Sequence, residues 1–128
     1  MSLRHTIAAA VLLPVSSLGL ISLTAGTPAA ASTKVTTVKA IETDFKIALS
    51  VKHFKPGTYT FLTENKGQTT HALEITGPGL HNATTKDLAP GQNAKLKVTF
   101  KKGNYDVFCP VPGHKALGMN VNLVISSS

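Results

Sequence analysis

From residue 34 onward, turn residues recur at short intervals and no apolar stripe of helical period lies between them, which restricts the chain to folds built from strands. Clusters such as Pro56-Gly57, Gly77-Pro78-Gly79 and Pro90-Gly91 separate segments that are rich in Val, Thr, Ile and Phe. This pattern predicts an all-β, antiparallel sandwich. The expected strands are Lys34–Ile41, Phe45–Leu49, Thr58–Thr63, His71–Thr76, Asn93–Phe100, Asn104–Cys109 and Met119–Ile125, with Leu80–Ala89 as a loop or a short helical turn.

The amino-terminal end has the layout of a secretory signal peptide. Arg4 gives a basic start, an apolar run follows from Ile7 to Leu23, and small residues occupy Thr27–Ser32. We expect residues 1–31 to be cleaved off, leaving residues 32–128 as one extracytoplasmic domain with a single core. A retained membrane anchor is the alternative, but Pro14 and the small residues make the run a poor spanning helix.

The mature part is basic, but its composition does not favour nucleic-acid binding. The chain has 13 Lys plus Arg, and its one arginine is Arg4, so residues 32–128 have 12 lysines against 6 acidic residues and a net charge of +6 (12 minus 6). Arginine is the preferred side chain for bidentate contacts with bases and phosphates, and none remains. Scattered lysines instead favour protein partners with acidic surfaces.

Strand alternation places several unusual side chains on the core side. In Asn93–Phe100, Ala94, Leu96, Val98 and Phe100 share one face and the lysines take the other. By the same rule His71, Cys109 and Met119 point inward, each at the end of an expected strand.

Cys109 is the only cysteine, and an unpaired cysteine in an exported protein indicates an intermolecular disulfide, a reactive thiol or a metal ligand. Each inward residue also has an ordinary structural explanation, since a buried Cys, His or Met can simply fill the core. The loop Cys109–Met119 changes this balance, because it places Cys109, His114 and Met119 at five-residue steps among prolines and glycines. His71 lies 38 residues before Cys109 (109 minus 71) and offers a second imidazole.

This donor set predicts copper. Soft sulfur suits Cu(I) and imidazole nitrogen suits Cu(II), so a thiolate, two imidazoles and a distant thioether accommodate both oxidation states with little rearrangement. Zinc would favour a fourth ligand such as water or a carboxylate, and no carboxylate stands at a matching spacing.

The run Gly103–Cys109, leading into Pro112-Gly113-His114 and Met119, resembles the ligand loop of the cupredoxins, the family of plastocyanin, azurin, amicyanin and rusticyanin. The spacing is most similar to that of rusticyanin and the sulfocyanins. The resemblance implies a Greek-key β-sandwich of about seven to eight strands that binds one copper ion. It implies His71, Cys109 and His114 as equatorial ligands and Met119 as the axial ligand.

One position departs from the family pattern. Many cupredoxins have an Asn directly after the first His ligand, where it braces the Cys loop, and this chain has Ala72. Asn65 and Thr70 are candidates to replace that brace. His53 and His81 lie near turns, where we expect them to be solvated.

A site closed by four protein ligands favours a single-electron carrier over an enzyme, because a catalytic metal keeps an open position. Copper delivery is the alternative, but such proteins usually have more methionines than Met1 and Met119. A metal-free sandwich would leave the four donors unexplained. We expect a monomer that docks redox partners through an apolar patch around His114, with Lys115 at its rim. The expected patch is Pro110, Val111, Pro112, Ala116 and Leu117, joined by Leu80.

Overall fold

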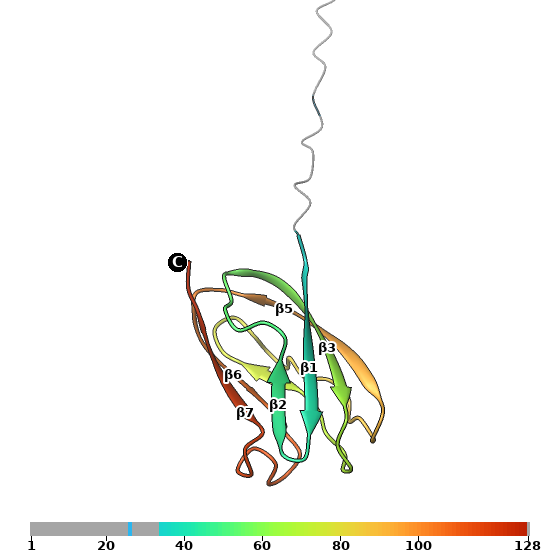
Figure 1. Ribbon diagram of the computed structural model, residues 1–128. Helices are drawn as coiled ribbons and strands as arrows, with labels where there is room; N and C mark the ends of the chain where they lie inside the picture. The colour runs from blue at the N-terminus through green and yellow to red at the C-terminus, as the bar shows by residue number, and fades with distance from the viewer. Residues whose placement is uncertain (1–25, 27–33, 128) are drawn as a thin grey trace, which may run out of the picture. The chain divides into compact units, whose positions relative to one another are not determined.

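The computed structural model describes Gly26 and residues 34–127, so the predicted signal peptide lies outside the described residues apart from Gly26. The described part is built from strands (Figure 1), and it has no helix long and apolar enough to span a membrane. The strands are β1 Thr36–Thr43, β2 Lys46–Leu49, β3 Gly57–Asn65, β4 Glu74–Thr76, β5 Asn93–Phe100, β6 Gly103–Phe108 and β7 Asn120–Ile125.

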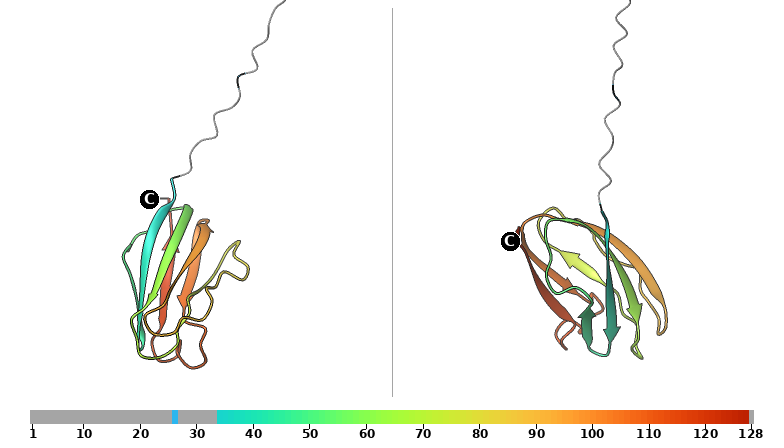
Figure 2. Two further views of the ribbon diagram at one scale, coloured as in Figure 1. Left: turned by 90° about the vertical axis from the view of Figure 1, so that its right-hand side faces the viewer. Right: turned by 45° about the horizontal axis from the view of Figure 1, so that its top comes forward.

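These seven strands form two sheets, with the order β2-β1-β3-β5 in the larger and β4-β6-β7 in the smaller (Figure 2). The predicted all-β sandwich is confirmed, but it is not antiparallel throughout. β1 and β3 run parallel, from Thr36 opposite Tyr59 to Glu42 opposite Asn65. The reason is that β2 turns back along the other edge of β1, and residues 50–56 then return the chain to the level at which β1 begins.

The strand expected at His71–Thr76 is shorter than predicted. β4 begins only at Glu74, because the loop after it returns and pairs with the preceding residues. The backbone N–H of His71 donates to Leu88 O at 3.0 Å, and the N–H of Leu88 donates to His71 O at 2.7 Å. Thr84 likewise pairs with Glu74. The segment Leu80–Ala89 is therefore a loop, and it holds the backbone of His71 in place.

The apolar core is richest at the end of the sandwich where β3 and β6 begin. Five aromatic rings meet there with centroids 4.7 to 6.2 Å apart. Such contacts add to the stabilisation from apolar burial. The alternation predicted for β5 holds, since Val98 and Phe100 are buried and Lys95 and Lys97 are exposed. The five rings are those of Phe54, Tyr59, Phe61, Phe100 and Tyr105.

Candidate metal centre

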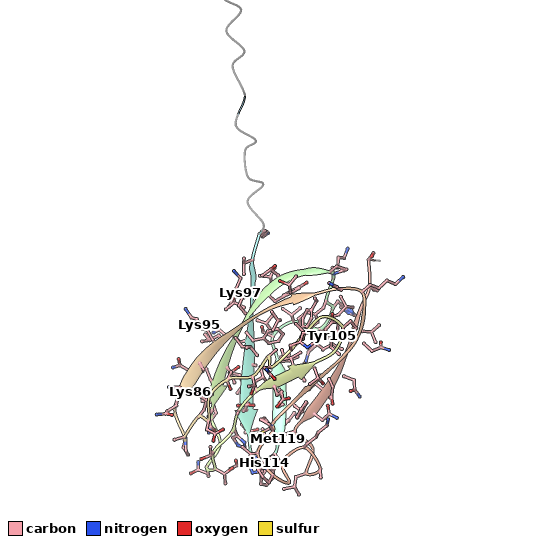
Figure 3. All side chains as sticks on the ribbon, turned by 180° about the vertical axis from the view of Figure 1, so that it is seen from behind. Lys86, Lys95, Lys97, Tyr105, His114 and Met119 are labelled. Atoms are coloured by element: carbon pink, nitrogen blue, oxygen red, sulfur yellow. The ribbon has the colours of Figure 1, made fainter. Side chains whose placement is uncertain are left out.

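The smaller sheet brings the predicted ligands to the end of the sandwich opposite Tyr105 (Figure 3). His71 lies before β4, Cys109 follows β6, and His114 lies in the loop between β6 and β7. That loop is held by its own backbone, because Cys109 N–H donates to Met119 O at 3.1 Å and Met119 N–H donates to His114 O at 3.1 Å. Gly113 and Gly118 have φ angles of 86° and 120°, which other residues rarely adopt, so glycine is required for the sharp bends.

Three donor atoms converge at this loop. The Nδ1 atoms of His71 and His114 are 3.1 Å apart, and the Sγ atom of Cys109 lies 3.9 Å from the first and 3.6 Å from the second. His71 and Cys109 are fully buried, whereas His114 is half-buried. A metal ion with the usual bond lengths to nitrogen and sulfur, about 2.0 to 2.3 Å, fits among atoms at these spacings.

The surroundings of Cys109 favour a cation at this position. Burial raises the pKa of its thiol, and the backbone N–H groups of Ala72 and Val111 offset only part of that effect. The negative charges of Glu42 and Asp87 raise it further. A thiolate at neutral pH therefore needs a bound cation, which deprotonates a coordinating thiol.

Met119 has no exposed surface and lies beside His114 at the same end of the domain (Figure 3). Its backbone pairs with both Cys109 and His114, so the loop begins and ends at neighbouring positions. The sequence-predicted His71, Cys109 and His114 thus form one group, with Met119 buried next to them. His53 and His81 are exposed and do not belong to the group.

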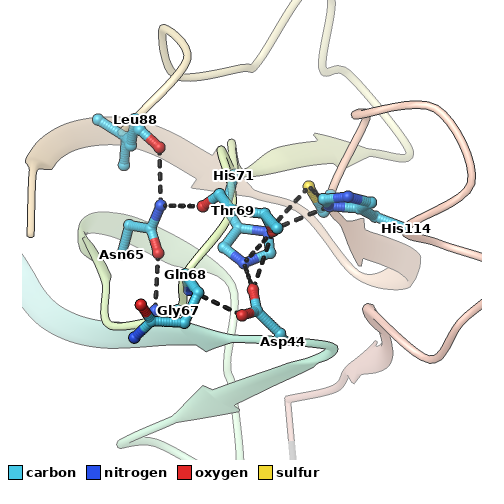
Figure 4. A network of polar contacts seen from close by, with 9 residues as sticks. Asp44, Asn65, Gly67, Gln68, Thr69, His71, Leu88 and His114 are labelled. Carbon is cyan, nitrogen blue, oxygen red and sulfur yellow. Dashed lines mark hydrogen bonds and ion pairs between the residues drawn. The ribbon is translucent and has the colours of Figure 1, made fainter. Parts of the chain in front are cut away.

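Asp44 is a partner of the site that the sequence analysis missed. It lies in the turn between β1 and β2, and its Oδ1 is 2.7 Å from Nε2 of His71 (Figure 4). The backbone N–H of Gln68 and the hydroxyl of Thr69 also donate to this carboxylate. These hydrogen bonds lower the pKa of Asp44 to about 2, the bond from Gln68 contributing most. Asp44 is therefore ionised at neutral pH.

Asn65 stabilises the segment that precedes His71. Its side-chain NH₂ donates to Thr69 O at 2.8 Å and to Leu88 O at 2.7 Å, and its Oδ1 accepts from Gly67 N–H (Figure 4). These contacts reach the His71 side of the site and not the Cys109 loop, so Asn65 does not reproduce the family's brace of that loop. Thr70 is exposed.

Phe45, also in the β1–β2 turn, was not anticipated from the sequence. Its ring packs edge-on against His114 with centroids 4.9 Å apart, and against His71 at 6.5 Å. An isolated aromatic residue near a turn carries no local signal of this role. The two imidazoles are thus packed by an apolar ring from the larger sheet.

The surface around His114 agrees with the expected patch except at two residues, and one of them, Val111, is half-buried and packs against the core. Pro110, Pro112 and Ala116 are exposed, and Leu117 is 60 % exposed. Leu80 was expected there, and that expectation is wrong. Its loop packs against Tyr105, whose hydroxyl donates to Pro78 O at 2.7 Å, and Tyr105 lies at the opposite end of the domain.

Lys115 is engaged within the domain. Its ammonium forms an ion pair with Asp106 and lies 4.0 Å from the centroid of the Phe108 ring. Its positive charge is therefore partly neutralised beside His114.

A two-sheet β-sandwich with a buried Cys and two His at one end defines a mononuclear metal-binding domain of the cupredoxin class. A family model described as copper binding proteins, plastocyanin/azurin family, matches residues 29–126. The chain belongs to the plastocyanin/azurin family of copper-binding proteins, and copper is its cofactor.

Solved structures share the fold at low sequence identity. Reduced auracyanin from the photosynthetic bacterium Roseiflexus castenholzii is 22% identical with a TM-score of 0.58, over 71% of this chain and 97% of that one. Reduced rusticyanin is 20% identical with a TM-score of 0.57, over 74% and 81%. A copper-containing nitrite reductase from Thermus scotoductus is 11% identical with a TM-score of 0.56, over 71% of this chain and 31% of the enzyme. No curated protein sequence matches the chain.

Proposed function

We propose that this protein is an exported single-electron carrier that exchanges electrons with partner proteins through a copper ion. The observation that carries the proposal is the burial pattern of the donor set. His71, Cys109 and Met119 have no exposed surface, and only His114 reaches the outside. We assign His71, Cys109 and His114 as equatorial ligands and Met119 as a weak axial ligand. Bound copper supplies the one-electron couple.

The protein's contribution is a frame that does not change shape on reduction. The Cys109 and Met119 ends of the loop are joined by backbone hydrogen bonds, and the backbone of His71 is paired with Leu88. Both segments are therefore anchored independently of the metal. The fixed ligand positions are a compromise between the geometries that Cu(I) and Cu(II) prefer. Because these positions stay the same in both oxidation states, the reorganisation cost of electron transfer is low.

The absence of an open coordination position in the assigned ligand set supports a carrier over an enzyme. A catalytic metal keeps an open coordination position for substrate, whereas four side chains occupy this site in our assignment. Relatives of the fold include a nitrite reductase, but this chain matches only 31% of it. The shared part is the sandwich.

Export and docking extend the proposal. The leader pattern of residues 1–31 supports an extracytoplasmic location. The exposed Leu117 and its neighbours support electron exit at His114, since an apolar patch of this kind suits a small, transient redox contact. We propose that the protein acts as a monomer.

The decisive experiment is the absorption spectrum of the copper-loaded protein. Ligation by Cys109 should give an intense charge-transfer band in the visible region that disappears on reduction. Cys109→Ala should remove both the band and copper retention. Met119→Leu should retain the band and raise the reduction potential, because a weak donor to Cu(II) is lost. A colourless copper complex of the parent protein, with stoichiometric zinc bound in preference, would contradict the proposal.

A further inference from the structure

The carboxylate of Asp44 accepts hydrogen bonds at both of its oxygens. Its Oδ2 accepts from the backbone N–H of Gln68 at 2.7 Å. Its Oδ1 accepts from the Thr69 hydroxyl at 2.9 Å and lies 2.7 Å from Nε2 of His71. An ionised carboxylate offers two acceptor oxygens and no donor, so Nε2 of His71 must carry its hydrogen in this contact. The tautomer of His71 is therefore defined by Asp44.

This tautomer directs the other ring nitrogen to the metal centre. With the hydrogen on Nε2, the lone pair of Nδ1 is free, and Nδ1 is the atom that faces Cys109 and His114. Gly67 leaves the room for this arrangement. A Cβ atom there would clash with Oδ1 of Asp44 and would lie 2.7 Å from Nε2 of His71.

Asp44 also connects the two layers of the sandwich. It follows β1 in the larger sheet, whereas His71 precedes β4 in the smaller sheet. The hydrogen bond therefore fixes the imidazole ring relative to a layer that supplies no ligand. Hydrogen-bonded partners of this kind orient a metal-bound histidine and increase its basicity.

We propose that Asp44 is a positioning residue that holds His71 in its metal-binding tautomer and makes the site favour Cu(II) over Cu(I). The inference rests on the proposed function, since it concerns the same copper couple. A negative charge hydrogen-bonded to the imidazole strengthens donation to the metal, and the more highly charged ion gains more from it. Removal of that charge should destabilise Cu(II) more than Cu(I).

Asp44→Asn is the principal variant, because an amide keeps the size of the side chain and one acceptor oxygen but removes the charge. We expect the ratio of Cu(II) to Cu(I) affinity to fall by about tenfold or more, measured by chelator competition in each oxidation state. A tenfold fall corresponds to a rise of about 59 mV in a one-electron potential, which spectroelectrochemistry measures independently.

Asp87→Asn is the matched control. Asp87 is exposed and acts on Cys109 through its charge, and no hydrogen bond from its side chain is seen among the described residues. If the loss of a negative charge were enough, without the hydrogen bond to His71, Asp44→Asn and Asp87→Asn would lower the ratio of Cu(II) to Cu(I) affinity equally. We expect the Asp87→Asn shift to be several times smaller.

The copper-free protein gives a second, independent readout. ¹⁵N NMR of the His71 ring should show the hydrogen on Nε2 in the parent, and a mixture of tautomers in Asp44→Ala. A purely structural role would lower the melting temperature of the copper-free protein without changing the affinity ratio.

Three results would overturn the inference: an affinity ratio within twofold of the parent in a blue Asp44→Asn variant, an equal shift in Asp87→Asn, or a hydrogen on Nδ1 in the parent. Failure of the parent to form a blue complex would instead refute the proposed function, and the NMR experiment would still test the tautomer.

Discussion

Among individual residues, Glu42 is the least expected. It lies on β1, has no exposed surface, and neither carboxylate oxygen has a hydrogen-bond partner in the described part of the protein. The buried hydroxyl of Thr63, on the neighbouring strand β3, also lacks a partner there. Burial raises the pKa of Glu42 from 4.5 to about 7. The side chain is therefore protonated in mildly acidic solution, where a neutral carboxyl costs less to bury.

This shift predicts a pH-dependent stability. The folded protein retains the proton on Glu42 up to about pH 7, whereas the unfolded chain releases it near 4.5. As the pH rises from 4.5 to about 7, the free energy of unfolding should therefore fall by roughly 3 kcal/mol in all. Urea unfolding of the copper-free protein across this range measures the effect.

Glu42→Gln is the control for that measurement, since the amide has a similar shape and no titration. In this variant the decline between pH 4.5 and about 7 should disappear. Asp44 does not interfere, because its pKa is lowered to about 2 and its contribution to stability is lost only as the pH falls below 4. A parent protein whose stability is flat across the window would contradict the burial argument.

At the scale of elements, the loop between β6 and β7 determines the geometry of the site. Its backbone closes on itself through Cys109 and Met119, and its bends require glycine at Gly113 and Gly118. The two glycines differ in their surroundings. A Cβ at Gly113 would meet nothing within 4 Å, whereas one at Gly118 would lie 3.2 Å from the backbone oxygen of Phe45.

The pair of variants Gly113→Ala and Gly118→Ala separates loop strain from site geometry. Both should lose stability, by about 1 to 2 kcal/mol, because alanine is disfavoured at positive φ. Only Gly118→Ala should also change the visible spectrum of the copper complex, since it displaces the turn that packs Phe45 against the imidazoles. Equal spectral changes in both variants would indicate that backbone strain, and not contact with Phe45, shapes the site.

For the folded domain as a whole, charge is distributed unevenly between the two outer faces. The larger sheet exposes four lysines, and its outward carboxylate, Glu64, is paired with Lys66. The smaller sheet turns Glu74 and Asp106 outward. Because Lys115 is paired with Asp106, we propose that steering of acidic partners depends on the lysines of the larger sheet. These are Lys39, Lys46, Lys95 and Lys97.

Docking itself should depend on the apolar patch. Leu117→Asp places a charge where a partner must exclude water, so electron exchange should slow by roughly tenfold or more while the spectrum stays unchanged. Val124→Asp is the control, because Val124 is 72% exposed on β7 and lies outside the patch. Stopped-flow oxidation by several small redox proteins measures both. Equal rates for Leu117→Asp and the parent would place the electron exit elsewhere.

Local sequence was enough to predict the sandwich and the four side chains assigned to the metal, His71, Cys109, His114 and Met119. Strand alternation predicted that His71 and Cys109 point inward, and both are buried. At His71 the alternation itself does not hold, because β4 begins only at Glu74 and Ala72 is buried as well. The spacing between Cys109, His114 and Met119 lies within one short loop, so it needed no knowledge of distant contacts. The copper assignment followed from the donor types, which are a property of residues and not of their arrangement.

The tertiary structure decided what depends on pairing between distant segments. The parallel β1–β3 pair and the return of Leu88 to His71 join segments whose local patterns give no register. Asp44 and Phe45 come from a turn in the other sheet and meet the histidines only after the layers pack. Leu80 failed as a patch residue because its loop lies at the far end of the smaller sheet. Periodicity determines which face a residue occupies, but chain topology determines which end it reaches and what it meets there.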